Sequence, residues 1–132
     1  MSRLDLLNGK KKAHVTKDEY KSNFASQLQK TSHTVTQLQE FGVGDDSLLK
    51  LEFFFYTNTY EKASSLAVAL ESEGYLVDYG TPAGEKNSLV ITGWTVPMRM
   101  TTLNIQVWAE QMCSIGYEHD CEFDGWGTTI EQ

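Results

Sequence analysis

Apolar and polar residues alternate along residues 48–57, which is the pattern of a β-strand with one buried face. One face consists of Leu49, Leu51, Phe53 and Phe55, and the other of Lys50, Glu52, Phe54 and Tyr56. Two further stretches, residues 75–79 and 88–96, are short, largely apolar and bounded by turn-forming residues. We therefore predict three strands, of which residues 48–57 and 88–96 have the most buried character.

Three other stretches place apolar residues at helical spacing. Residues 17–40 carry a narrow apolar stripe, and Thr16 with Glu19 forms the sequence pattern of a capping box. The middle of this stretch is polar, so we predict either one helix or two pieces. Asn58 is predicted to cap a second helix, and the third is predicted over residues 100–115.

The stretch after Gly116 is predicted to be a fourth strand with an acidic face. Gly116 ends the third helical pattern, and apolar or neutral residues then alternate with four carboxylates. These carboxylates are Glu118, Asp120, Glu122 and Asp124. The strand runs into Asp124-Gly125-Trp126-Gly127, a turn sequence in which two glycines flank a tryptophan. We interpret the rest of the chain as the scaffold of this acidic strand.

The predicted elements follow the order β-α-β-β-α-β, which is the ferredoxin-like order. Right-handed crossovers place both helices of such a unit on one face of a four-stranded antiparallel sheet. We therefore predict an α+β fold, with a ferredoxin-like sandwich at residues 45–132 and an N-terminal leader and helix at residues 1–44. The two most apolar strands should be central, and the acidic strand should be an edge beside the first strand.

Charge is distributed unevenly along the 132 residues. Residues 1–44 carry seven Lys and Arg against four Asp and Glu, residues 45–132 carry four against fourteen, and the formal net charge is −7. An acidic body repels phosphate backbones and attracts basic partners, although it also serves solubility alone. No apolar run is long enough to span a membrane, so we expect no membrane segment. The first residues include no continuous apolar segment like that of a signal peptide, so we expect a cytoplasmic protein. We expect the two cysteines to be free core residues.

Catalysis and metal binding are poorly supported by the residues. A catalytic carboxylate pair needs one buried member with a raised pKa, whereas an exposed edge strand solvates its acids. His119 and Cys121 could both contact a metal ion, but two ligands do not complete a site. Packed, neutral side chains are the simpler interpretation. We therefore expect no metal, no cofactor and no enzymatic activity, with a small hydrolase as a less favoured alternative.

RNA binding is a second alternative, because RNA-recognition motifs share the predicted element order and stack bases on exposed aromatic residues. Residues 88–94 lack the basic and aromatic pattern that such domains use. The acidic charge also opposes the electrostatic attraction on which affinity for nucleic acid largely depends. We therefore expect no direct contact with nucleic acid.

Binding of a basic protein segment agrees best with the residues, since Arg pairs with carboxylates and with aromatic faces. The predicted partner-binding residues are Glu118, Asp120, Glu122, Asp124, Trp126, Phe54 and Tyr56. Phe54 and Tyr56 lie on the sheet face opposite the two helices, which either the N-terminal helix or a partner must cover. Trp126 is either a contact residue or a core residue. Both a monomer and a homodimer are compatible with the sequence.

A family resemblance adds to this interpretation. The segment Tyr117 to Glu131, centred on Glu122-Phe123-Asp124-Gly125-Trp126-Gly127-Thr128, resembles the C-terminal signature of the RraB family, regulators of ribonuclease E activity. The resemblance extends more loosely over residues 48–130 and does not visibly cover residues 1–44. It implies a ferredoxin-like fold and a protein that binds the endoribonuclease outside its catalytic centre and restrains RNA decay. The matched positions are Asp124, Gly125, Trp126 and Gly127, as contacts or as scaffold.

The resemblance supports the predicted fold more strongly than it supports the identity of the binding partner. Members of the family are expected to continue into a long acidic tail, whereas this sequence ends at Gln132 and begins with a basic leader. The predicted function is therefore a non-catalytic protein that binds a basic partner, a ribonuclease, and inhibits or modulates it. The alternative is an immunity protein that neutralises a toxin nuclease, an analogy based on small size, acidity and a cytoplasmic location.

Overall fold

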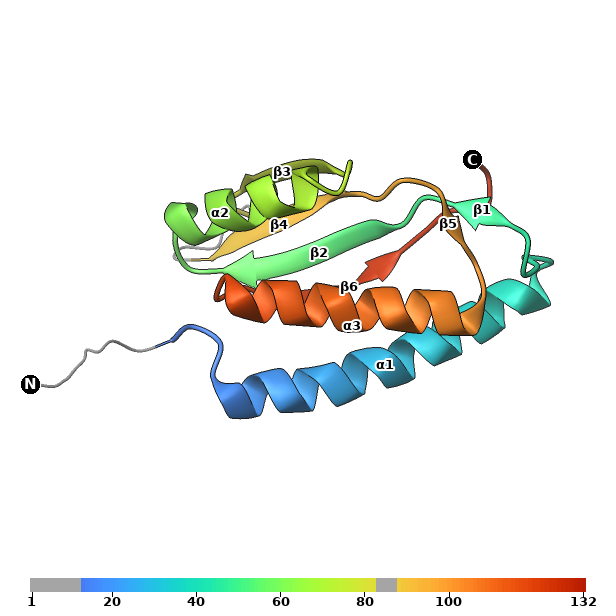
Figure 1. The fold of residues 1–132 in the computed structure, drawn as a ribbon, viewed down its shortest axis with the longest axis horizontal. Helices are drawn as coiled ribbons and strands as arrows, with labels where there is room; N and C mark the ends of the chain where they lie inside the picture. The colour runs from blue at the N-terminus through green and yellow to red at the C-terminus, as the bar shows by residue number, and fades with distance from the viewer. Residues whose placement is uncertain (1–12, 83–87) are drawn as a thin grey trace, which may run out of the picture.

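A computed structural model describes residues 13–82 and 88–132 of the chain (Figure 1). Its helices are α1 (Lys17–Glu40), α2 (Tyr60–Glu71) and α3 (Thr102–Glu118). Its strands are β1 (Leu48–Leu49), β2 (Glu52–Thr57), β3 (Leu76–Gly80), β4 (Leu89–Trp94), β5 (Met98–Arg99) and β6 (Glu122–Gly127). The predicted leader lies largely outside the described residues, since these begin at residue 13.

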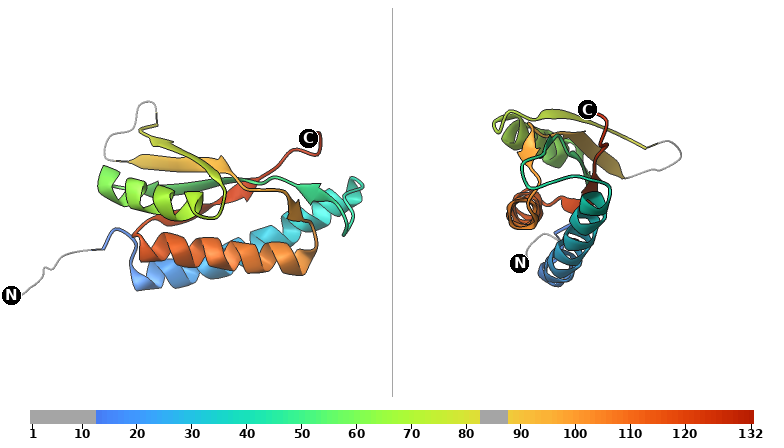
Figure 2. Two further views of the ribbon diagram at one scale, coloured as in Figure 1. Left: turned by 45° about the horizontal axis from the view of Figure 1, so that its top comes forward. Right: turned by 90° about the vertical axis from the view of Figure 1, so that its right-hand side faces the viewer.

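Four strands form the main sheet in the order β3-β4-β2-β6, with antiparallel pairing throughout. Helices α2 and α3 lie on one face of this sheet (Figures 1 and 2). The predicted α+β fold with a four-stranded antiparallel sheet is therefore confirmed, and the order of strands is that of the ferredoxin-like unit. The most apolar strands, β2 and β4, are central, and β6 is the edge beside β2, as predicted.

The predicted faces of the first strand are confirmed. Leu51, Phe53 and Phe55 are completely buried beneath the helices, whereas Phe54 and Tyr56 are half-buried on the opposite face. That opposite face, here called the open face, also carries the half-buried Val90, Thr92 and Trp94 of β4. Their positions follow from the strand period of two, which sends alternate side chains to opposite sides of the sheet.

The stretch predicted as one strand over residues 48–57 is interrupted. Its first two residues, β1, pair with β5 in a separate two-stranded sheet, and the main-sheet strand starts only at Glu52. At the break, the amide of Leu51 donates to Oγ1 of Thr95 at 2.9 Å, and the amide of Thr95 donates to the carbonyl of Leu51 at 2.9 Å. These bonds satisfy the backbone where the ladder stops, so the chain can change sheets without exposing unpaired groups.

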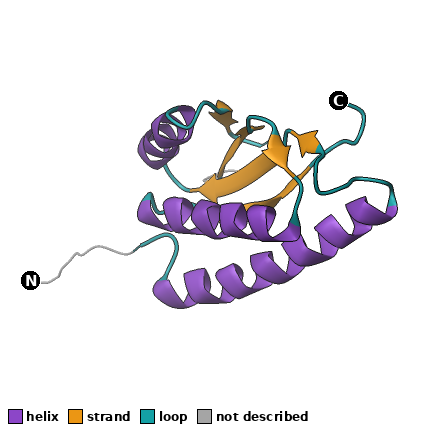
Figure 3. Ribbon diagram, turned by 45° about the vertical axis from the view of Figure 1, so that its right-hand side comes forward, coloured by secondary structure: helices purple, strands orange, loops and turns teal. Residues whose placement is uncertain are grey.

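Helix α1 is a single helix with the predicted bounds and cap. The amide of Glu19 donates to Oγ1 of Thr16 at 3.1 Å, and the amide of Thr16 donates to the Glu19 carboxylate at 2.9 Å, which completes the capping box. The helix packs along α3 and beside β6, not over the open face (Figure 3). Of the two occupants foreseen for the open face, the N-terminal helix reaches only its edge, where α1 side chains and Phe54 line one groove.

Two predicted helix boundaries are wrong. Thr59, not Asn58, caps α2, because its hydroxyl accepts the amide of Lys62. Helix α3 continues through Gly116 to Glu118, and the chain reverses at Asp120 with φ of +57°. Gly116 is required for close packing instead, since a Cβ there would lie 2.8 Å from the carbonyl oxygen of Cys121 and 2.9 Å from the Phe55 ring.

Candidate functional site

The predicted acidic strand face does not exist as one unit. Glu118 is the exposed last residue of α3, Asp120 lies in the following turn, and only Glu122 and Asp124 belong to β6. The alternating polarity of residues 117–121 does not reflect a strand, because the last turn of α3 exposes Glu118 and the following turn directs Asp120 to partners inside the fold. The Tyr117 ring stacks on Tyr20 of α1 with a centroid distance of 4.3 Å, which fixes this turn as helix.

Asp120 is an internal anchor of the fold. Its carboxylate lies 2.7 Å from Nζ of Lys62 on α2 and accepts the backbone amides of His14 and Val15, each at 2.7 Å. Partial burial would raise the pKa of this carboxyl, but the hydrogen bonds from Lys62, Val15 and His14 outweigh it and hold the pKa below its usual value. These contacts connect the segment before α1 and the N-terminal part of α2 to the turn after α3. Both carboxylate oxygens of Asp120 therefore already have partners inside the fold.

Replacing Asp120 with alanine should lower the free energy of unfolding by about 2 kcal/mol at neutral pH, since charged hydrogen bonds are lost and a positive φ is left to alanine. Because the pKa is lowered in the folded state, this stabilisation is present above the unfolded-state pKa and is lost as the pH falls through the folded-state pKa. Urea unfolding from pH 7 down to pH 3 measures it. A constant difference between the two proteins over that range would contradict the assignment.

The Asp124-Gly125 pair forms a β-bulge in the edge strand. Phe54 of β2 pairs with Gly125 and Phe55 pairs with Phe123, so Asp124 is the extra residue and its side chain is exposed. Gly125 has φ of +125°, a conformation that residues with a Cβ rarely adopt. The bulge therefore explains the first glycine of the motif and leaves the Asp124 side chain exposed.

Helix α1 covers the outer edge of β6 through side-chain amides. The carbonyl of Phe123 accepts Nδ2 of Asn23 at 2.8 Å and Nε2 of Gln27 at 3.4 Å. Because an edge strand presents unpaired backbone groups, these contacts protect it from pairing with another chain. Gln27 is 97% buried as a consequence of this packing.

Trp126 is packed between α1 and α3. Its Nε1 donates to Oγ1 of the buried Thr31 at 2.9 Å, and its ring meets Trp108 edge-to-face with a centroid distance of 6.2 Å. The residue pairs with Phe53 across the sheet, so it lies on the helix-covered face. Of the two interpretations of Trp126, this geometry favours the core residue.

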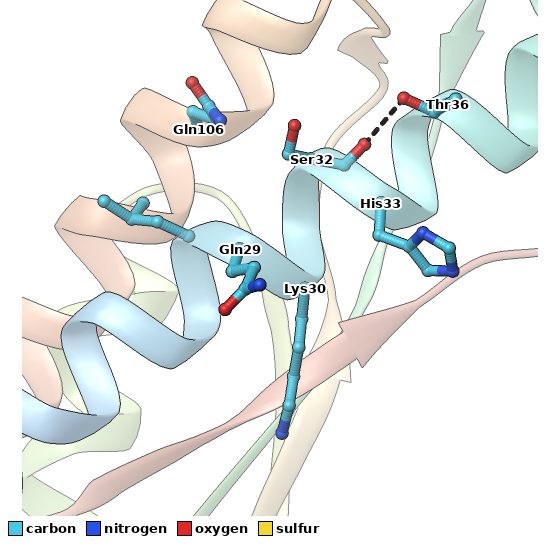
Figure 4. Close-up of a pocket in the computed structure, with 7 residues that line it drawn as sticks. Gln29, Lys30, Ser32, His33, Thr36 and Gln106 are labelled. Atoms are coloured by element: carbon cyan, nitrogen blue, oxygen red, sulfur yellow. Dashed lines mark hydrogen bonds between the residues drawn. The ribbon is translucent and has the colours of Figure 1, made fainter.

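The structure brings three of the predicted residues together in a groove between α1 and β6. Phe54, Asp124 and Trp126 line it, and its volume is about 320 Å³. The α1 wall consists of Gln27, Lys30, His33 and Thr34, none of which was predicted from the sequence. Figure 4 shows Lys30 and His33 extending from α1, where they also border a neighbouring depression reaching Gln106 of α3. The one feature of the sequence that relates these four residues is their helical spacing, which places them on one side of α1.

Tyr56 and Glu122 are partners across β2 and β6 at the rim of the open face. Partial burial raises the pKa of the Glu122 carboxyl above its usual value, and the nearby carboxylates of Glu19 and Asp124 raise it further. Glu122 is thus the centre of a small negative region between β6 and the first turns of α1. Like charges crowded in this way favour a positively charged neighbour.

Among the described residues, the two cysteines and His119 take part in packing and hydrogen bonds within the fold. Cys113 and Cys121 are buried free thiols, as predicted, and burial raises the pKa of Cys121 to about 11. Nδ1 of His119 lies 2.8 Å from Oγ of Ser65, which joins the end of α3 to α2. Within residues 13–82 and 88–132, no three His, Cys, Asp or Glu side chains are grouped as a metal site would need. Over the same residues, none of the helices combines the length and apolarity needed to cross a bilayer.

Comparison with known proteins identifies a family. The family described as regulator of ribonuclease activity B, RraB, matches residues 28–128, from the middle of α1 to Thr128, just after the Gly-Trp-Gly motif. The match thus reaches further towards the N-terminus than the resemblance seen in the sequence. No curated protein matches the chain. Because the family covers well over half of the 132 residues, the chain belongs to the RraB family of regulators of ribonuclease activity.

Proposed function

We propose that this protein binds a ribonuclease directly and modulates its activity without catalysing a reaction of its own. The observation that carries the proposal is membership of a family described as regulating ribonuclease activity. Regulation of an enzyme by a small domain is most simply achieved by stoichiometric binding. We place the encounter in the cytoplasm, where ribonucleases that process cellular RNA act.

We propose the open face and its acidic rim as the contact surface. Phe54, Tyr56 and Trp94 offer half-buried aromatic area there, and the three described helices lie on the opposite face or along the β6 edge. The acidic residues Glu52, Asp78, Glu122 and Asp124 stand on this face or at its rim. Aromatic residues surrounded by carboxylates suit a basic segment, because Arg and Lys interact with both.

We propose only some of the predicted partner-binding residues as contacts. Glu122, Asp124, Phe54 and Tyr56 remain in the proposed surface, since they lie together on or beside the open face. Asp120 and Trp126 serve the scaffold, because their polar atoms already have partners inside the fold. Glu118 lies apart from this surface, at the end of α3.

If the carboxylates of Glu122 and Asp124 attract a basic segment of the ribonuclease, removing their charge should lower the affinity. Replacing Glu122 with glutamine and Asp124 with asparagine should raise the Kd for the ribonuclease about tenfold at low salt, mainly by slowing association. The matched control replaces Glu61 and Glu71 on the exposed side of α2 with glutamine and should change the Kd less than twofold. Surface plasmon resonance with ribonuclease E from the same cell, at two salt concentrations, measures both. Equal affinity for the two pairs would contradict the proposed surface.

A pull-down from the parent cell separates the two candidate targets. Capture of a cellular ribonuclease supports the regulator, whereas capture of a nuclease encoded as a toxin supports the immunity alternative. Binding of single-stranded RNA by the purified protein, with no captured protein, would contradict both. Because the charge of the chain is −7, we expect no RNA binding at physiological salt.

A further inference from the structure

A cleft lies between α3 and the end of α2 with the turn that follows it, on the helix-covered side of the main sheet. The two helices are joined at one end, where Ser65 lies 2.8 Å from His119 and Lys62 lies 2.7 Å from Asp120. Towards the other end they separate, because α3 packs along α1 and α2 packs on β3 (Figures 1 and 3). The cleft opens where they part.

The cleft is lined by a mixture of apolar walls and polar edges. The lining residues are Leu70, Glu73, Tyr75, Trp108, Gln111, Met112 and Ile115. Its volume is about 270 Å³, which lies below the usual range of small-molecule sites and suits one large apolar side chain. The Tyr75 hydroxyl accepts Nε1 of Trp108 at 3.2 Å, and partial burial raises its pKa. Since the Tyr75 oxygen acts as the acceptor in that bond, its hydroxyl hydrogen can be donated to an incoming carbonyl.

Of the residues that the structure describes, the one charged residue that lines the cleft is acidic, and a second carboxylate lies on the same side of α3. Glu73 belongs to its lining, and Glu118 follows Gln111 and Ile115 on the same side of α3, seven and three residues later. Lys62 of α2 is already paired with Asp120. An occupant of the cleft thus meets two carboxylates and no unpaired ammonium group from the described part of either helix.

We infer that the α2–α3 cleft is a second docking site, which accepts a large apolar side chain from a Lys- or Arg-flanked segment of the protein partner. The apolar side chain enters between Leu70 and Ile115, and the flanking cations lie against Glu73 and Glu118. This inference rests on the proposed function, since the partner is the ribonuclease. The cleft adds a contact on the helix-covered side, opposite the open face. One partner segment can therefore wrap around the domain, or two segments can bind independently.

The test measures the affinity of the ribonuclease for two charge-reversed pairs of variants. Replacing Glu73 and Glu118 with lysine should raise the Kd at least tenfold. The control replaces Glu61 on α2 and Glu110 on α3 with lysine. Both are exposed, and neither lines the cleft or continues the row of Gln111, Ile115 and Glu118 along α3, so the Kd should change less than threefold. Both pairs carry the same net charge, so the difference between them isolates position. Equal losses for the two pairs would overturn the inference.

A second variant tests the apolar part without changing charge. Gln111→Trp places an indole over the cleft and should weaken binding about tenfold, whereas Gln39→Trp on α1 should not. Circular dichroism melts verify that each variant is folded. If the unmodified protein fails to bind the ribonuclease at all, the proposed function falls. If it binds, and both cleft variants bind equally well, only the cleft is refuted.

Discussion

Replacing Trp126 with alanine is expected to lower the free energy of unfolding by about 3–5 kcal/mol. The indole fills the space between α1 and α3, and its removal leaves a cavity beside Trp108. It also leaves the hydroxyl of Thr31, which is only 1% exposed, without the indole donor that it now accepts. Denaturant unfolding followed by circular dichroism measures the loss.

Two control variants separate the contributions of Trp126. Trp126→Phe keeps most of the packing and should lose about 1–2 kcal/mol through the missing hydrogen bond. Thr31→Val in the Trp126→Phe background should restore part of that loss, because both unpaired groups are then removed. An alanine variant as stable as the unmodified protein but unable to bind the partner would show instead that Trp126 is a contact residue.

Replacing Gly93 with alanine is expected to cost at least about 3 kcal/mol, the upper end of the range for overpacked cores. Gly93 lies in the central strand β4, and a Cβ there would stand 1.9 Å from the carbonyl oxygen of Leu76 and 2.7 Å from Cζ of Phe53. The backbone oxygen cannot move without breaking the pairing of β3 with β4. Thermal unfolding should therefore show a large drop in Tm.

Gly80 supplies the matched control for Gly93. It also lies in a strand, β3, but a Cβ there meets no atom within 4 Å. Gly80→Ala should therefore change the free energy of unfolding by no more than about 0.5 kcal/mol. Equal effects at the two positions would mean that the close approach at Gly93 is relieved cheaply by a small shift.

Local patterns predicted much of this fold correctly. The capping box of Thr16 and Glu19 and the alternation within residues 52–57 depend on neighbours in sequence, so they are visible without the structure. The order of elements then limits the sheet to few topologies, because crossovers are right-handed. The fold class and the edge position of β6 follow from that order.

The site could be predicted only in part, because its residues meet through packing. An alternating stretch at residues 117–121 was assigned to a strand, but the stacking of Tyr117 on Tyr20 and the anchoring of Asp120 by Lys62 favour a helix end and a turn. Similarly, the polar stripe of α1 gives no sign that Gln27 caps the carbonyl of Phe123. Contacts between segments about one hundred residues apart leave no periodic trace in the sequence.

The most direct test of the account is a titration of ribonuclease activity. A fixed concentration of ribonuclease E, well above the Kd, cleaves a fluorescent RNA oligonucleotide while this protein is added in steps. We expect the cleavage rate to change linearly and to level off at a fixed stoichiometric ratio, with this protein recovered unchanged. A rate that is unaffected at a large excess of this protein, for ribonuclease E and for every ribonuclease captured from the parent cell, would contradict it.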